Sequence, residues 1–595
     1  MPIEALGIFA YFNKQRFVQF GCGDIANWYG VSASDTKKGQ ALYPAMGRKH
    51  ITSFGENKLV FDTEPSLIFK TINYFYVIVG TQIIQVDKFY NQRFLGNVPL
   101  GSQNWYAYLP VGNLVYVMIT AGDRIFVITE GPGNAVSMQR ITDPNAPTKP
   151  LYIGTFGNRF VVSQANTPDF YLTEVNLASP PTFTFDPNAA FTVNGAALVA
   201  RASGVIGQIG VLHNQLYIFC DFTTDIWANI QSQITVAGQT FEFPFKLNSS
   251  YNWDYGIADP FSLSIDFGRM AWQARNTSGL VTFMSSNGQQ PQDISTQAIN
   301  VLLQNSTDGD DFSPFITEDT DGFLYQYENT IFYRVSAGPY EDFGELDIVE
   351  SANALEFNFT TQTWGRVIEL NGERNRIKKH VFFNNVHLVT VLGDGAIYQM
   401  AGNIYYNELR TPDVAAQDPL AFTKYPMRYE LTTQQIYMDD YAEFITDYVE
   451  IDFVFGEKDF FRNNITGDNT IFIITEDAAP DGTPVFCIAE DSIDGQDVFL
   501  VIERGGNGGQ SFDDNHYNQL YKPHIELYYS DDGGVTFTSA DVREFSRLGQ
   551  YRWRMRWYEL GVSRNRAYRL IAVSSAPIVV LGAVQNVRRS SGGAN

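Results

Sequence analysis

The sequence predicts an all-β protein with a β-propeller-like body, C-terminal antiparallel strands and an inserted small β-module. Aromatic residues make up 15% of the 595 residues and charged residues only 18%, which favours half-buried strands over long charged helices. Short apolar runs alternate with Gly, Asn and Asp turns from residue 51 to about 440. Paired runs recur roughly every 40 to 50 residues, a spacing typical of propeller blades, and a stack of β-sandwiches is the alternative.

The body of the predicted propeller follows an N-terminal arm. Residues 1–50 hold several turn formers and little periodicity, so we expect an extended arm that packs across other elements. The body spans 51–438 and consists of short strands with close turns, for example NLVYVMITAGDRIFVIT at 113–129. The one helical pattern, ISTQAINVLL at 294–303, is short.

The C-terminal region contains the most regular strand pattern. In QYRWRMRWYEL, residues 550–560, aromatic and apolar residues alternate with three arginines, Arg552, Arg554 and Arg556. Successive side chains of a strand point to opposite faces, so the three arginines share one polar face while the aromatic residues face a core.

A second strand, DYVEIDFVFG at 447–456, alternates in the same way and places Glu450 and Asp452 on its polar face. We predict that 439–456 and 522–589 form one C-terminal antiparallel sheet. If the two strands are neighbours in this sheet, the arginines form cross-strand ion pairs with the two acids, each worth up to about 1 kcal/mol.

The charge distribution is uneven along the chain. Residues 457–521 read as an inserted acidic β-module between the paired strands, and 590–595 form a short tail. The window 439–503 carries seventeen acidic residues against two basic ones, whereas eight arginines lie within 543–569. DNA contact is one explanation of this basic island. Pairing with the acidic window, in the same chain or on a neighbouring subunit, explains both anomalies.

One motif suggests carbohydrate chemistry. SDDGGVTF matches the Asp-box pattern S-x-D-x-G-x-x-[WF] with Ser530, Asp532, Gly534 and Phe537. In sialidases and related propellers this box is a hairpin turn: the Asp caps backbone amides, the glycine takes a positive φ, and the aromatic ring packs beneath. A single box indicates a structural turn. A glycosidase needs two carboxylates facing each other, and the adjacent Asp531 points away from Asp532.

No catalytic, cofactor-binding or metal-binding residue is predicted. The chain has no Walker A, G-x-G-x-x-G or G-x-S-x-G motif, and its six histidines show no zinc-site spacing. His380 and His387 differ by an odd number, so they fall on opposite faces of a continuous strand. The acidic clusters 308–311 and 490–495 do not match an EF-hand loop, so solvated turns are favoured over calcium sites.

The cysteine content, the N-terminal sequence and the net charge limit where the protein is expected to be located and which partners it is expected to bind. Three widely spaced cysteines do not form a disulfide scaffold, and the N-terminus lacks the pattern of a signal peptide, so we expect assembly in a reducing cytoplasm. The net charge of −24 argues against a broad grip on nucleic acid. A negative net charge is compatible with a channel through which DNA slides.

Two blocks of motifs occur in a fixed order. The earlier block contains LHNQLYIFCDFTTDIW (212–227), FEFPF (241–245), YGIADPFSL (255–263), MAW (270–272), NGQQPQDISTQAI (287–299) and later TTQTWGRV. The C-terminal block reads P-x-I-x-L-x-x-S-x-D-G-G-x-T-F and then G-x-Y-x-x-R-x-R-W-x-x-L-G-x-S-R-N-R-x-Y-R-L. It comprises Pro523, Ile525, Leu527, Ser530, Asp532, Gly533, Gly534, Thr536, Phe537, Gly549, Tyr551, Arg554, Arg556, Trp557, Leu560, Gly561, Ser563, Arg564, Asn565, Arg566, Tyr568, Arg569 and Leu570.

This order resembles the packaged-DNA stabilisation proteins, which are the tail hub or nozzle components of short-tailed bacteriophages. The two blocks cover about half of the chain. Asp225 stands where Glu is usual in the family and Phe537 where Trp is usual. The insertion 457–521 has no counterpart in the resemblance.

The resemblance implies a structural virion protein and not an enzyme. Family members form a ring, commonly a homohexamer, below the portal and its adaptor ring; they extend the DNA channel and retain packaged DNA until ejection. Expected partners are further copies of the chain, the portal-adaptor ring protein, a tail needle or plug, and tailspikes or fibres, with DNA passing unbound. The expected location is the virion tail. The alternatives are a glycan-binding or glycan-hydrolysing propeller of a tail or secreted protein, and a nucleic-acid-binding module.

Overall fold

The computed structural model describes residues 3–6, 22–32, 40–51, 59–101, 103–173, 185–193, 196–230, 232–236, 239–248, 252–304, 320–336, 354–410, 422–438, 442–455, 486–488, 499–501, 524–544 and 552–590. Strands dominate these residues, so the predicted all-β class is confirmed. The one α-helix in these ranges, α1 (Gln297–Gln304), begins three residues later than predicted. In the same ranges, no helix has the length and apolarity needed to cross a bilayer.

Seven small antiparallel groups of strands follow one another through the body. The first comprises β6 (Pro65–Lys70), β7 (Phe75–Val79), β8 (Gln82–Val86) and β9 (Gln92–Asn97). The second comprises β10 (Asn104–Val111), β11 (Leu114–Ala121), β12 (Arg124–Glu130) and β13 (Val136–Arg140). The third comprises β14 (Pro150–Phe156), β15 (Arg159–Gln164), β16 (Asp169–Leu172) and β18 (Ala196–Arg201), with β17 (Thr192–Val193) paired to β18.

The fourth comprises β19 (Ile206–Leu212), β20 (Gln215–Cys220), β21 (Thr224–Ala228) and β24 (Lys246–Leu247), with a hairpin of β22 (Ser232–Val236) and β23 (Gln239–Phe243) between the last two. The fifth comprises β25 (Tyr255–Ile257), β26 (Ser264–Asp266), β27 (Arg269–Asn276), β28 (Val281–Ser286) and β29 (Gln292–Asp293). The sixth comprises β30 (Asp321–Tyr327), β31 (Thr330–Ser336), β32 (Ala354–Asn358) and β33 (Thr363–Arg366). The seventh comprises β34 (Ile377–Phe383), β35 (Val386–Val391), β36 (Ile397–Ala401) and β5 (Gly47–His50).

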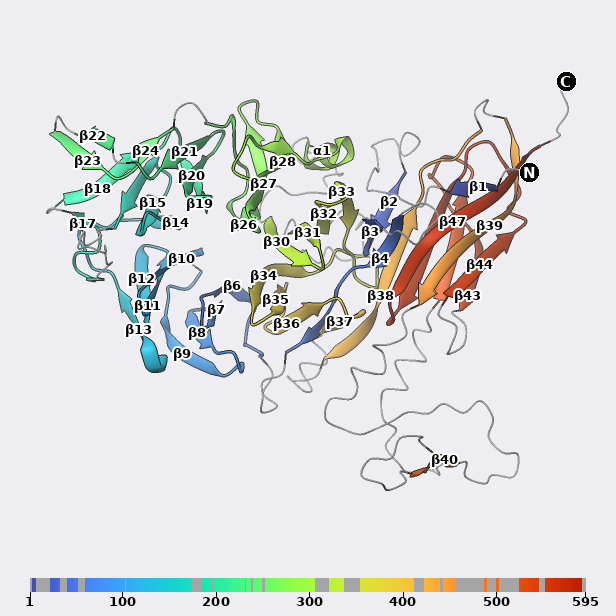
Figure 1. Ribbon diagram of the computed structural model, residues 1–595, viewed down its shortest axis with the longest axis horizontal. Coiled ribbons are helices and arrows are strands. Elements are labelled where there is room, and N and C mark those ends of the chain that lie inside the picture. Colours follow the sequence, from blue (N-terminus) through green and yellow to red (C-terminus); the bar gives the residue numbers. More distant parts are fainter. Residues whose placement is uncertain are drawn as a thin grey trace.

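These groups are the blades of a β-propeller. One edge strand of each group contacts an edge strand of the next in cyclic order, from β6 through β10, β14, β19, β26 and β30 to β34, which contacts β6 again. A hydrophobic core fills each space between neighbouring blades, and one built around Ile68, Val77 and Leu388 joins the last blade to the first. In Figure 1 the propeller runs from blue to yellow and lies to the left of the orange and red C-terminal strands.

The described residues within 1–50 pack across other elements as expected, but they do so as hydrogen-bonded strands of the two bodies and not as a separate arm. β5 pairs with β36 as the outer strand of the seventh blade. Hydrogen bonds between these two strands therefore close the ring of blades. Strand β2 (Asp24–Ala26) pairs with β38 (Thr423–Thr432) and β33, while β3 (Trp28–Ser32) pairs with β4 (Gln40–Pro44). The sequence pattern around 47–50 gave no sign of this, because the partner of β5 lies some 350 residues away.

The C-terminal strands form a sandwich of two sheets instead of the single sheet predicted for 439–456 and 522–589. One sheet has the order β3, β4, β47 (Ile578–Arg589), β39 (Phe444–Phe455) and β44 (Arg552–Tyr558), with β1 (Ile3–Leu6) and β45 (Val562–Ser563) at its sides. The other contains β2, β38, β46 (Ala567–Ser574), β42 (His524–Ser530) and β43 (Thr538–Glu544). One core, which includes Trp28, Tyr429, Phe453 and Trp557, lies between the two sheets.

Strand β38 joins the two bodies. Its first residues pair with β37 (Tyr406–Leu409), which lies beside β5 of the seventh blade, and its last residues pair with β46 of the sandwich. The propeller and the sandwich therefore share one hydrogen-bonded path of strands, and the predicted body boundary at 438 falls after a strand that belongs to both. Of the predicted module 457–521, only the hairpin of β40 (Phe486–Ile488) and β41 (Phe499–Val501) lies within the described residues, as does Ser590 of the predicted tail.

Candidate interaction site

The predicted cross-strand pairs lie on the outer face of the sandwich. β39 and β44 are antiparallel neighbours, with Glu450 opposite Arg556 and Asp452 opposite Arg554. The Nε of Arg556 lies 2.8 Å from Glu450, and the Nε of Arg552 lies 3.1 Å from Asp452. Arg554 is less closely held, at 3.7 Å from Asp452. Hydrogen bonding to these carboxylates raises the pKa of Arg552 and of Arg556, so both stay charged.

The Asp-box residues form a turn between β42 and β43. The carboxylate of Asp532 accepts hydrogen bonds from the backbone amides of Val535 and Thr536, at 3.0 and 2.9 Å, and from the hydroxyls of Ser530 and Thr536. Slight burial opposes ionisation, yet these donors, led by Thr536, lower the pKa of Asp532 to about 2. Gly534 has a φ of 93°, as predicted for this motif. The oxygens of Asp532 are therefore occupied within the turn.

The neighbouring acid has a different role, which the sequence did not reveal. Asp531 accepts hydrogen bonds of 2.7 and 3.0 Å from Arg566, whose side chain is fully buried. Asp531 and Asp532 thus point apart, as predicted, because one reaches back to the sandwich while the other caps the turn. Phe537 is half-buried, and the guanidinium of Arg569 lies 3.9 Å from its ring centre.

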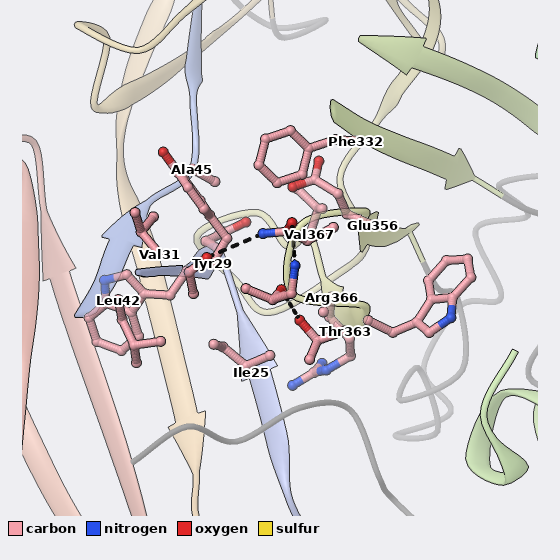
Figure 2. Close-up of a pocket in the computed structure, with 17 residues that line it drawn as sticks. Ile25, Tyr29, Val31, Leu42, Ala45, Phe332, Glu356, Thr363, Arg366 and Val367 are labelled. Atoms are coloured by element: carbon pink, nitrogen blue, oxygen red, sulfur yellow. Dashed lines mark hydrogen bonds between the residues drawn. The ribbon is translucent and has the colours of Figure 1, made fainter. Parts of the chain in front are cut away.

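A cavity of about 120 Å³ lies where the propeller meets the sandwich (Figure 2). Ile25, Tyr29 and Leu42 line it from the N-terminal strands, and Trp364 and Arg366 line it from the sixth blade. Its charged lining is already neutralised, because Arg366 binds Asp24 and Glu430 at the same time. The cavity is therefore best described as a gap in the joint between the two bodies.

Asn27 lies beside this cavity and links three segments. Its Nδ2 donates to the carbonyls of Ile368 and Arg428, at 2.8 and 2.7 Å, and its Oδ1 accepts from the amide of Ile368 at 3.1 Å. The backbone of Asn27 has a φ of 57°, which Asn adopts more readily than other non-glycine residues. One side chain therefore connects the N-terminal segment to the end of the sixth blade and to β38.

Side chains from three blades meet on the propeller axis. Phe261 precedes β26 in the fifth blade, and its ring stacks on Trp105 of the second blade with centres 4.5 Å apart. Lys379 of the seventh blade lies 4.5 Å from the same ring centre and pairs with Asp321 of the sixth blade at 2.6 Å. Blades two, five and seven are not neighbours, so these contacts cross the axis and block it at the level of Phe261.

His380 and His387 lie on the same face, because the segment is not the continuous strand for which opposite faces were expected. A two-residue turn at Asn384 and Asn385, both with positive φ, divides the segment into a hairpin. The Nε2 of His380 then lies 2.9 Å from the Nδ1 of His387. Burial lowers the pKa of both histidines, that of His387 to about 4, and the neighbouring His387 and Arg334 lower that of His380 further.

The described residues include no group of three or more His, Cys, Asp or Glu that is placed to hold a metal ion. The acidic clusters 308–311 and 490–495 lie outside those residues. Cys22 and Cys220 are buried free thiols.

Comparisons with known proteins assign no family to the chain. No protein-family model matches the chain, and no curated protein matches it. Among solved structures, virginiamycin B lyase from Staphylococcus aureus is 9% identical, with a TM-score of 0.31, over 60% of this chain and 99% of that chain. The WD40 domain of Neurospora crassa Pan2 is 7% identical, with a TM-score of 0.32, over 57% and 89% of the two chains. An ancestral GH74 enzyme is 11% identical, with a TM-score of 0.36, over 61% and 53%.

Proposed function

We propose that this chain is a structural subunit of the tail hub, or nozzle, of a short-tailed bacteriophage. In this role it forms a ring below the portal and adaptor, extends the DNA channel and helps to retain packaged DNA until ejection. The observation that carries the proposal is the ordered resemblance of two motif blocks, which fall on the fourth, fifth and sixth blades and on the sandwich strands β42 to β46. Its partners are other copies, the adaptor ring, a needle or plug, and spikes or fibres.

The joint between propeller and sandwich supports a structural role, because it fixes the two bodies relative to each other. The two bodies share backbone hydrogen bonds through β2, β38 and β37, and the ion pairs of Arg366 and the amide of Asn27 reinforce this path. A subunit of a ring needs this kind of fixed relation between its parts, because each copy positions the next.

The filled axis of the propeller constrains where DNA runs. Phe261, Trp105 and Lys379 occupy the axis of a single copy. We therefore place the DNA path between several copies that surround it, and not through any one propeller. The net charge of −24 suits a channel wall that does not hold DNA by its phosphates.

The alternative function, a glycan-cleaving propeller, receives no support from its own motif. A glycosidase needs two carboxylates that face a sugar from opposite sides. Asp532 is held by turn donors, and Asp531 is paired with buried Arg566. We propose no reaction for the chain.

Native mass spectrometry of the purified chain, alone and mixed with portal and adaptor proteins, tests the proposal. We expect a closed ring of copies that joins the portal and adaptor, and particles that lose their genome when the chain is absent. A monomer that does not bind the adaptor and that hydrolyses host polysaccharide would refute the proposal.

A further inference from the structure

The outer face of the sandwich carries five arginines that lie above their acidic partners. We call this set the arginine face: Arg552, Arg554, Arg556, Arg564 and Arg588. In every pair the arginine is the more exposed member, for example 59% for Arg552 against 17% for Asp452. A partner that approaches this face therefore meets guanidinium groups first. A guanidinium has five N–H donors and a single carboxylate uses only some of them, so donors remain for a second acceptor.

The surroundings of these arginines are typical of a protein interface. Arg556 lies over the ring of Tyr448, 4.4 Å from its centre, and Tyr558 and Val562 on the same sheet are 59% and 50% exposed. Arginine and tyrosine are enriched at interface centres, where they combine large contact areas with hydrogen bonding.

The charge of the chain identifies the complementary surface. Residues 522–595 hold eleven basic and six acidic residues, a net of +5, so the preceding 521 residues hold the remaining −29 of the total of −24. The rest of a second copy is therefore acidic overall, which is complementary in sign to the arginine face of the first. The two surfaces differ, so the contact is head-to-tail, the type that generates rings.

We propose that the arginine face binds the acidic part of a second copy of this chain, and that this contact joins neighbouring subunits. The inference rests on the proposed ring and assigns its interface. DNA is the weaker candidate for this face, because the exposed Val562 beside the arginines suits an apolar contact with a protein and not with phosphates.

The test compares self-association of the wild type with that of the Arg552→Gln/Arg554→Gln variant by sedimentation velocity, at about 0.05 M and about 0.5 M salt. We expect the wild type to associate more weakly at high salt, and the variant to associate at least about tenfold more weakly at low salt. The matched control is Arg201→Gln, which changes another exposed arginine, paired with Asp169, on the propeller. Unchanged thermal unfolding verifies that the variants fold, and Arg564→Gln serves as a second variant of the face.

The outcomes separate this inference from the proposed function. If the variant still assembles with itself as the wild type does, the inference is wrong while the tail-hub proposal stands. If the wild type associates neither with itself nor with portal and adaptor, both are wrong. If self-association is unchanged but retention of duplex DNA falls with Arg552→Gln/Arg554→Gln and not with Arg201→Gln, the face binds nucleic acid and the inference is overturned.

Discussion

Two histidines meet ring to ring between the sixth and seventh blades, and they make this seam sensitive to acid. The groups that face them are Tyr325, Arg334 and Glu356 from the sixth blade and Lys70 from the first. Arg334 and Glu356 neutralise each other in a buried ion pair. Glu356 is therefore already paired and does not stabilise a histidinium, and burial disfavours the charged form of both rings.

The pKa of His387 predicts the pH dependence of folding. The folded-state pKa of about 4 lies below the usual 6.5, so the unfolded chain takes up protons first. The associated stability is fully present above about pH 6.5 and is lost as pH falls towards 4, by up to about 3 kcal/mol. In urea unfolding at about pH 7 and about pH 4.5, we expect His387→Gln to lose less stability than the wild type. His213→Asn, at an exposed turn, should behave as the wild type.

The two adjacent aspartates of the Asp-box turn predict unequal effects of mutation. Asp531→Asn leaves the fully buried Arg566 without a carboxylate, which costs about 3 kcal/mol or more. Asp532→Asn weakens hydrogen bonds of an exposed turn, which costs about 1 kcal/mol. Thermal unfolding measures both. Replacing the arginine as well, in Asp531→Asn/Arg566→Met, should recover part of the loss. An equal or larger effect of Asp532→Asn would contradict this ranking.

At the scale of elements, the joint around Asn27 predicts a coupling between the two bodies. Asn27→Gly keeps the positive φ but removes three hydrogen bonds to Ile368 and Arg428, so we expect a loss of about 2 to 3 kcal/mol. The propeller and sandwich should then unfold in separate steps in calorimetry. Asn158→Gly, at an exposed hairpin turn with a φ of 60°, is the control and should leave a single transition. A single, unshifted transition in Asn27→Gly would show that the side chain does not couple the bodies.

The elements that the sequence predicted well are those whose pattern is local. The alternation of β44 identified its inward-facing Met555 and Trp557 and its outward-facing arginines, because side-chain direction repeats every two residues. The Asp-box turn was also predictable, since the donors and the acceptor of its hydrogen bonds lie within a few residues of each other.

The elements that the sequence missed depend on distant partners. β5 becomes part of a blade only because it pairs with β36, which is distant in sequence. Arg566 holds the Asp-box turn only because the fold brings Asp531 within hydrogen-bonding distance of it. The histidine pair was missed because the parity rule holds only within one strand, and the turn at Asn384 and Asn385 places the two histidines on different strands. The number of blades also needed the structure, since strand β5 is separated in sequence from β34, β35 and β36, the other three strands of its blade.

At the scale of the whole molecule, the N-terminal strands hold the two bodies together. Figure 1 shows β2, β3 and β4 in blue among the orange and red strands of the sandwich, while β5 continues into the propeller. The first fifty residues thus contribute to both cores, and Trp28 donates a hydrogen bond from its indole to Ile578 near the other end of the chain. A rigid two-body subunit results, in which a contact on the sandwich fixes the orientation of the propeller.

The filled propeller axis gives a prediction for the proposed particle. Phe261→Ala removes the ring that lies between Trp105 and Lys379, at a cost of about 3 kcal/mol in stability, and opens the axis of each copy. Since the DNA path is placed between copies, particles that carry this variant should protect their genome from nuclease as well as wild-type particles do. Quantitative amplification of the protected DNA measures this, with particles lacking the chain as the negative control. Genome loss from variant particles whose rings remain intact would mean that the DNA follows the axis of the propeller after all, because only that path is altered by the loss of one axial ring.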